Sequence, residues 1–159
     1  MLIGGTIGVF DLLHVGHLRF LQAVRRRCDR LQVGVGADAL LARTKRPPVI
    51  DEHQRQELLA GLSCVDAVCR FDIGLDQTVA SADWIAAWGI DLMVVGDDWR
   101  GSARWQRLEP ELAQRGIGCL WLPYTAGIST SLIRQRILAA DEHARCAALG
   151  ATIAEVNRC

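Results

Sequence analysis

His14 and His17 stand three residues apart in the stretch "GVFDLLHVGH", residues 8–17, directly after an apolar run at the N-terminus. If a helix begins near Val15, both imidazoles lie on its first turn, where unpaired backbone N–H groups and the helix dipole favour an anion. Gly16 adds no side chain that would block a close approach. The spacing therefore predicts contact with phosphate oxygens, including oxygens that gain charge in a transition state.

The same pair has two other interpretations. A single histidine in such a place would more often cap the helix or bond a carbonyl group, but the pairing favours phosphate. A shared metal ion would need more ligands, and Asp11 is the only carboxylate near the pair in the sequence. The pattern therefore does not favour structural zinc.

The elements that must position these residues alternate along the chain. Apolar runs rich in β-branched residues predict strands, and segments with helical periodicity lie between them. The predicted strands span 2–10, 31–37, 65–71, 91–96 and 118–123, and the predicted helices span 17–28, 51–62, 78–88, 104–115 and 129–140. Near-continuous apolar strands separated by helices indicate a parallel sheet with both faces covered.

We therefore expect an α/β fold: a Rossmann-like single domain with a five-stranded parallel sheet and helices on both faces. This domain spans residues 1–140, and residues 141–159 form a C-terminal helical extension of the same domain. Ligands of such sheets bind at the carboxyl ends of the strands. Four polar clusters follow predicted strands and should meet there, at 11–17, 38–46, 96–101 and 124–131.

Composition narrows the class of protein. Eighteen basic residues balance eighteen acidic ones among 159, which argues against nucleic acid as the main partner. Six cysteines without a CxxC pair, no signal-peptide pattern and no apolar run of ~20 residues predict a reduced cytoplasmic protein without membrane insertion. The stretch "RTKRPPVI", residues 43–50, is the strongest loop signal, because its two prolines forbid helix and three of its residues are cationic.

Three motifs resemble those of a known family. "GVFDLLHVGH" resembles the GxFDxxHxGH signature of the cytidylyltransferases in the nucleotidyltransferase superfamily, and "LPYTAGISTS", residues 122–131, resembles their second signature. "GDDWRG", residues 96–101, looks like the GDDWxG stretch of glycerol-3-phosphate cytidylyltransferases. Three motifs in the family's order are more specific than any one alone.

The resemblance implies an activity. The expected enzyme is a homodimer that uses Mg²⁺ and transfers CMP from CTP to a small phosphorylated or phosphonate alcohol, releasing pyrophosphate. Glycerol 3-phosphate is the first acceptor to consider. An enzyme of the same class that uses ATP, and a nucleotide-binding module without catalysis, are the alternatives.

The resemblance also implies roles for individual residues. His14, His17 and Lys45 are expected to be catalytic, and Asp11 is expected to orient the first turn or help to hold Mg²⁺. Nucleotide contacts are expected from the following residues: Gly8, Phe10, Gly16, Arg46, Arg55, Gly96, Asp98, Trp99, Tyr124, Gly127, Ile128, Ser129 and Thr130. Simpler interpretations stay open for some of them, since Arg55 could be a surface arginine and the serine-rich stretch a helix cap.

Two arginines of the family pattern are absent. Tyr124 and Ser63 stand at their positions, and neither can make a bidentate cationic contact to phosphate. Three explanations compete: the acceptor differs, catalysis has been lost, or another arginine supplies the charge, the candidates being Arg43, Arg46, Arg70, Arg100 and Arg104.

Overall fold

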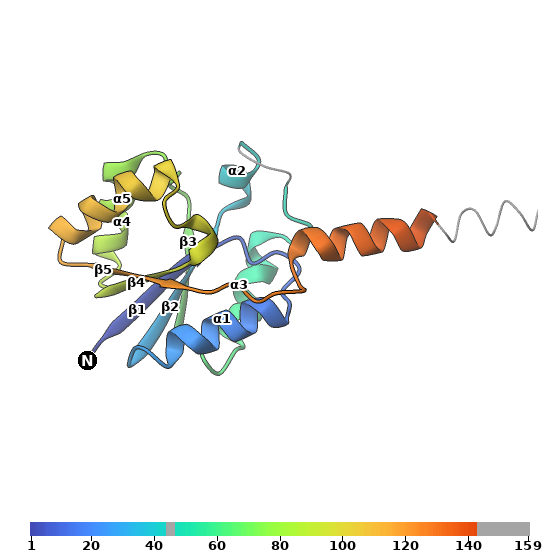
Figure 1. Ribbon diagram of the computed structural model, residues 1–159, viewed down its shortest axis with the longest axis horizontal. Helices are drawn as coiled ribbons and strands as arrows, with labels where there is room; N and C mark the ends of the chain where they lie inside the picture. The colour runs from blue at the N-terminus through green and yellow to red at the C-terminus, as the bar shows by residue number, and fades with distance from the viewer. Residues whose placement is uncertain (44–46, 143–159) are drawn as a thin grey trace, which may run out of the picture. The chain divides into compact units, whose positions relative to one another are not determined.

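A computed structural model of the chain describes residues 1–43 and 47–142 (Figure 1). Lys45, Arg46 and residues 143–159 lie outside the described residues, so the predicted C-terminal extension beyond residue 142 stays a prediction. The chain forms two compact units, Met1–Ala126 and Gly127–Cys159. The domain boundary predicted at residue 140 also stays a prediction.

The first unit is a five-stranded parallel sheet with strand order β3-β2-β1-β4-β5. Its elements in chain order are β1 (Ile3–Gly8), α1 (Val15–Arg25), β2 (Arg30–Gly36), α2 (Asp38–Leu41), α3 (Glu52–Ala60), β3 (Ala67–Phe71), α4 (Thr78–Ala87), β4 (Leu92–Gly96), the 3-10 helix η1 (Asp97–Trp99), α5 (Ala103–Gln114) and β5 (Gly118–Leu122). The predicted fold class is confirmed.

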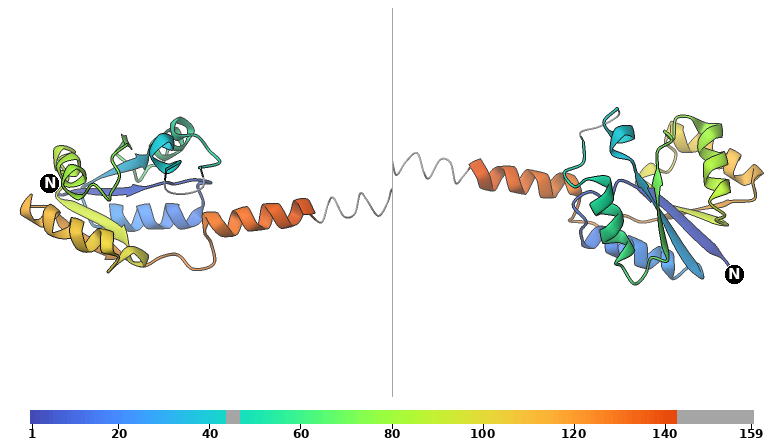
Figure 2. Two further views of the ribbon diagram at one scale, coloured as in Figure 1. Left: turned by 90° about the horizontal axis from the view of Figure 1, so that it is seen from above. Right: turned by 180° about the vertical axis from the view of Figure 1, so that it is seen from behind.

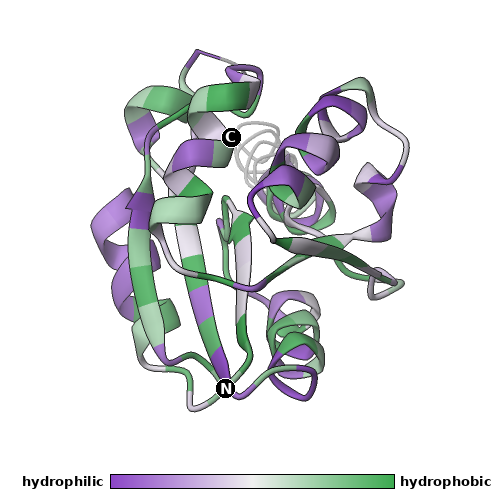
Figure 3. Cartoon of the chain, turned by 90° about the vertical axis from the view of Figure 1, so that its left-hand side faces the viewer, coloured by the Kyte–Doolittle hydropathy of each residue, from purple (hydrophilic) through white to green (hydrophobic). Residues whose placement is uncertain are grey.

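Two hydrophobic clusters hold the helices on opposite faces of the sheet (Figures 1 and 2). In the first cluster α1 and α3 pack on β2 through residues that include Leu21, Leu59 and Val33. In the second, α4 and α5 pack on β4 through residues that include Ile85, Leu108 and Met93. Figure 3 shows hydrophobic residues concentrated in the strands, while the helices alternate between hydrophobic and hydrophilic residues.

This arrangement follows from the handedness of parallel crossovers. The chain moves outward from β1 to β2 and β3, then returns past β1 to β4 and β5. Because βαβ crossovers are right-handed, the two directions place their helices on opposite faces. The winding reverses beside β1, which is the place where such sheets bind ligands.

The first strand ends earlier than the sequence predicts. β1 stops at Gly8, and α1 begins at Val15, because the chain between them makes a tight turn. Phe10 and Leu12 have φ values of 54° and 47°, in the left-handed region that side chains rarely adopt. Such backbone persists only where surrounding contacts hold it.

The second unit contains a helix whose described residues are 130–142. Gly127 has a φ of 80°, and the Ser129 hydroxyl accepts a hydrogen bond from Leu132 N at 3.1 Å. Ser129 thus caps this helix, as the simpler interpretation of the serine-rich motif expects.

Within the described residues, no helix has the length and apolar character needed to cross a bilayer.

Candidate active site

The two histidines cap the N-terminus of α1. Nδ1 of His14 accepts from Gly16 N at 3.1 Å, and Nδ1 of His17 accepts from His14 N at 3.3 Å. A nitrogen that accepts carries no proton, so these bonds assign the hydrogen of each neutral ring to Nε2. Capping and phosphate contact are therefore compatible, because they use opposite nitrogens of the same rings.

Both imidazoles are neutral at physiological pH. Burial, and then the neighbouring His14, lower the pKa of His17 to about 4, although Asp11 acts in the opposite direction. Burial also lowers the pKa of His14. The rings stack with their centroids 3.8 Å apart, an arrangement that two imidazolium cations would oppose.

One of the two Nε2 donors lacks a partner. Nε2 of His14 is buried and makes no hydrogen bond among the residues that the structure describes. A buried donor without a partner costs about 1–3 kcal/mol, and an oxygen of a bound ligand would remove this cost. The histidine pair thus offers hydrogen bonds to an oxygen-rich ligand.

Asp11 holds the turn that carries the histidines. Its carboxylate is buried, and Oδ1 accepts from Val49 N and Ile50 N at 3.0 Å each. The structure thereby favours the first of its two expected roles, orientation of the turn. In the described ranges, no group of three His, Cys, Asp or Glu side chains could hold a metal ion.

A cavity of about 350 Å³ opens at the carboxyl ends of the strands. It brings together eight of the residues predicted for the site: Gly8, Phe10, Gly16, His17, Gly96, Asp98, Trp99 and Tyr124. Since β1 is the middle strand, the wall residues that follow β2 and β3 form one side of the cavity and those that follow β4 and β5 form the other. We call these sides the β2 half and the β4 half.

The β4 half combines an aromatic wall with polar groups. Trp99 lies under the guanidinium of Arg104, whose Cζ is 5.4 Å from the ring centroid. A Cβ at Gly96 would approach Oδ1 of Asp98 to 2.5 Å, so the glycine keeps this carboxylate close to the strand end. Burial, and then Asp98, raise the pKa of Tyr124, which keeps its hydroxyl protonated as a donor.

The β2 half is mainly apolar. The sequence predicts that the segment 38–46 reaches the ligand end, but it does not single out any wall residue of this half as a site residue. Its wall residues end or follow β2 and β3 and are Gly36, Leu40, Leu41, Phe71, Gly74, Leu75 and Asp76. Phe71 is the last residue of its strand, and the rule that ligands gather at strand ends would have identified it. The short helix α2 gave no such signal, because four residues are too few to show a helical period.

The arginine candidates separate in the structure. Arg104 lines the cavity, whereas Arg70 is engaged elsewhere, with Nε 2.9 Å from Glu52 Oε1 and Nη1 3.6 Å from Asp72 Oδ2. Arg104 can therefore supply charge that Tyr124 does not.

The expectation for Arg55 needs correction. It is neither a surface arginine nor a wall residue of the cavity: it is 1% exposed, and its donors bond backbone carbonyl oxygens and Asp38. Because this guanidinium donates its hydrogen bonds to internal acceptors, it is not available to nucleotide phosphates. The sequence could not show this, because the carbonyl groups come from distant segments.

Among the cysteines of the described ranges, Cys28 is buried and the other three are partly buried. Cys28, Cys64, Cys69 and Cys119 are free thiols, and burial raises the pKa of each, to about 11 for Cys69 and Cys119. A thiol with such a pKa is a poor nucleophile at neutral pH.

Comparison with known proteins places the chain in a family. The Cytidylyltransferase-like family profile matches residues 6–136, and the chain belongs to this family of nucleotidyltransferases. "Bifunctional protein HldE" of Hyphomonas neptunium is 38% identical over 137 residues, covering 84% of this chain and 26% of that protein. The protein of the same name from Syntrophotalea carbinolica is 51% identical over 96 residues, covering 59% of this chain and 19% of that protein.

The chain thus spans about a quarter, 26%, of the length of the first of these relatives. Among solved structures, the lipopolysaccharide core biosynthesis protein of Thermoplasma volcanium superposes with a TM-score of 0.62 at 23% identity, covering 79% of this chain and 97% of that one. This likeness supports the fold. The predicted membership of the nucleotidyltransferase superfamily is confirmed.

Proposed function

We propose that this chain transfers a nucleoside monophosphate from a nucleoside triphosphate to the phosphate group of a small alcohol, releasing pyrophosphate. The observation that carries the proposal is the pair of neutral imidazoles, each with Nδ1 accepting from the backbone and Nε2 left as a donor. His17 lies in the wall of the cavity. Donors fixed in this way suit phosphate oxygens.

The proposed reaction needs no covalent enzyme intermediate. An oxygen of the acceptor phosphate attacks the α-phosphorus in line, and the bond from that phosphorus to the pyrophosphate oxygen breaks. His14 and His17 donate hydrogen bonds to oxygens that gain charge as this happens. Their neutral state suits the task, since donation requires no change of protonation.

The motifs alone carry the remaining proposed contacts. Ser129 and Thr130 hold the leaving phosphates, Gly127 and Ile128 shape that loop, and Lys45 adds charge together with its neighbour Arg46. Mg²⁺ arrives as the counter-ion of the nucleotide, whose oxygens supply its ligands.

Cytosine is our first choice of base, because the β4 half has an aromatic wall beside a carboxylate. Trp99 can pack against a base, and Asp98 can accept from an exocyclic amino group. The acceptor then occupies the β2 half, with glycerol 3-phosphate as the first acceptor to test.

The HldE relatives favour a second candidate, the adenylyl transfer to a sugar phosphate. Adenine also carries an exocyclic amino group, so Asp98 suits both bases. The two candidates share their chemistry and differ in donor and acceptor.

A pyrophosphate-release assay tests both candidates. CTP and ATP are each combined with glycerol 3-phosphate and with heptose 1-phosphate, and one combination should release pyrophosphate well above the others. The control is His14→Asn, because asparagine can still cap α1 through its side-chain oxygen but lacks the Nε2 donor. We expect its turnover to fall roughly 10²–10³-fold.

A failure would be informative. Thermal stabilisation by a triphosphate without pyrophosphate release from any alcohol phosphate would identify a binding module and overturn the proposal. Wild-type turnover in His14→Asn would overturn the role of the histidine.

A further inference from the structure

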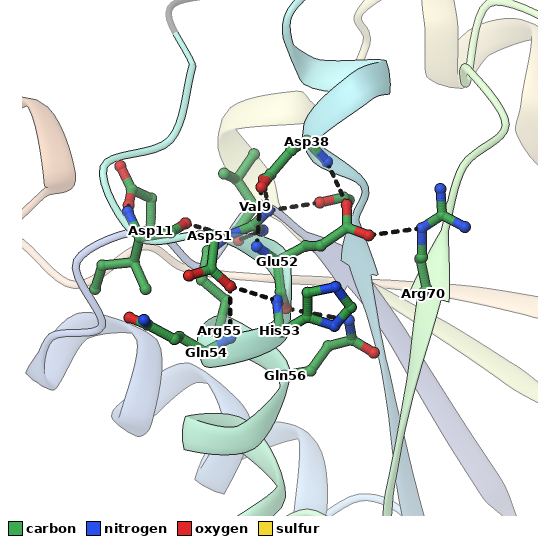
Figure 4. Close-up of polar contacts among 12 residues, drawn as sticks. Val9, Asp11, Asp38, Asp51, Glu52, His53, Gln54, Arg55, Gln56 and Arg70 are labelled. Atoms are coloured by element: carbon green, nitrogen blue, oxygen red, sulfur yellow. Dashed lines mark hydrogen bonds and ion pairs between the residues drawn. The ribbon is translucent and has the colours of Figure 1, made fainter.

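Arg55 ties four segments of the chain together beside the cavity (Figure 4). Its Nε donates to Ile50 O at 2.9 Å, Nη1 to Val9 O at 2.5 Å, and Nη2 to Gly36 O at 2.9 Å. Nη2 also bonds Asp38 Oδ1 at 2.5 Å, and the side chain of Arg55 has no exposed surface. The guanidinium thus joins four segments: the turn after β1, the end of β2, the helix α2, and the chain just before α3 at Ile50.

Two carboxylates extend this network by capping each other's helix. Asp38 N donates to Glu52 Oε2 at 2.6 Å, and Glu52 N donates to Asp38 Oδ2 at 3.0 Å. The first residues of α2 and α3 are therefore bonded reciprocally (Figure 4). Arg70 closes the network from β3 through its ion pair with Glu52.

The chemistry of a buried cation makes this arrangement demanding. A buried charge is costly unless its hydrogen-bonding groups are satisfied, so the network is stable only when all the acceptors are in place. Lysine keeps the charge but cannot reach four acceptors in a planar fork. The positions of the four segments are therefore coupled through one side chain.

Those segments build one side of the cavity. Val9 and Gly36, whose carbonyl groups Arg55 bonds, both line it. The helix α2, anchored through Asp38, contributes Leu40 and Leu41 to the β2 half. Asp98 and Trp99, the residues of the β4 half that we assign to the nucleobase, make no hydrogen bond or ion pair with Arg55 among the described contacts.

We propose that Arg55, Asp38 and Glu52 form a positioning clasp, which holds the β2 half, and hence the acceptor, against the histidine-bearing turn. The acceptor assignment rests on the proposed function. Arg55 acts through the backbone and α2, without touching the nucleotide. The clasp therefore governs acceptor binding and turnover more than nucleotide affinity.

Arg55→Lys and Asp38→Asn test the clasp kinetically. We expect kcat to fall and the KM of the acceptor to rise, together lowering kcat/KM roughly tenfold or more, because small displacements of reacting groups have large effects. Nucleotide affinity, measured by calorimetry without acceptor, should fall by less than kcat/KM, since Arg55 makes no described contact with the β4 half and Asp11 still holds the histidine-bearing turn. If Arg55→Lys does not fold, Asp38→Asn carries the kinetic test.

Two controls separate positioning from loss of stability. Arg115→Lys makes the same chemical change in an arginine that pairs with Asp83 and Glu111, away from the cavity. Ile85→Val removes one methyl group from the second hydrophobic cluster. Neither control variant should raise the KM of the acceptor relative to the Kd of the nucleotide.

Hydrogen exchange supplies a readout that needs no activity. The amides of Val49 and Ile50 should exchange faster in Arg55→Lys, because Ile50 loses the bond from Nε, and should be unchanged in Arg115→Lys. Unchanged exchange, or a fall in nucleotide affinity as large as the fall in kcat/KM, would overturn the clasp. An inactive wild type with the expected exchange pattern would overturn the proposed function and support the clasp.

Discussion

At the scale of single residues, each histidine of the pair divides its work between its two nitrogens. Nδ1 of His14 and of His17 satisfies backbone N–H groups, which fixes the tautomer and the ring orientation. The protonation of either ring would place a hydrogen on Nδ1 and break that bond. Low pH should therefore damage the helix start as well as the site.

The sign of this pH effect follows from His17. The pKa of His17 is about 4 in the folded protein, whereas an ordinary histidine, as in the unfolded chain, has a pKa of 6.5. Between these values the unfolded chain binds a proton that the folded chain does not, so stability is full above pH 6.5 and decreases as the pH falls toward 4. Urea unfolding at a series of pH values should show this decrease, and His17→Asn should flatten it. An equally steep decrease in the variant would contradict the assignment.

Asp11 offers a second prediction, on metal binding. Asp11→Asn keeps an oxygen that can accept from Val49 N and Ile50 N, so the variant should fold. If Asp11 only orients the turn, the Mg²⁺ concentration for half-maximal turnover should change by less than about twofold, whereas loss of a direct ligand would raise it much more. A titration of turnover with Mg²⁺ distinguishes the two outcomes.

At the scale of elements, the end of β1 determines where the histidines lie. Gly8 is the last residue of the strand, and the ring of Phe10 folds back over it. The left-handed φ of Phe10 makes this possible, and Phe10 is buried in the first hydrophobic cluster. Strand, turn and helix are thus fixed to each other by packing as well as by Asp11.

Gly8→Ala should disturb this turn. A Cβ at residue 8 would lie 2.8 Å from Cε2 of Phe10, and the ring is buried and cannot move aside freely. We expect a loss of about 1–3 kcal/mol in the free energy of unfolding, as for other overpacked sites. Chemical denaturation measures it, and Gly118→Ala, whose nearest contact is an ordinary 3.5 Å, is the matched control in a strand.

At the scale of the whole molecule, the reversal of strand order places two different walls around one histidine-bearing turn. The β4 half is aromatic and polar, and the β2 half is mainly apolar. This separation suits a reaction with two substrates that meet at one phosphorus atom.

The assembly state is the prediction at this scale. The resemblance to cytidylyltransferases implies a homodimer, so light scattering should give twice the chain mass of 17.5 kDa. A mass equal to that of one chain at the concentration used in the turnover assay would contradict the expectation.

The sequence by itself determined the alternation of strands and helices and predicted the class of chemistry. Strand and helix periods differ, so alternating apolar runs were enough to predict the parallel sheet, and the histidine motif predicted a phosphate site at its edge. These signals are local, and local physics sets them.

The tertiary structure alone decided what the polar residues beside the motif do. The sequence predicts that Arg55 contacts the nucleotide and that Asp11 orients the turn or helps to hold Mg²⁺. In the structure Asp11 bonds backbone groups 38 and 39 residues away, and Arg55 bonds one that is 46 residues away. The apolar β2 half likewise forms only when α2 and the end of β3 come together. These contacts form because the crossover connections bring the strand ends together. No local sequence pattern specifies which distant residues will meet there.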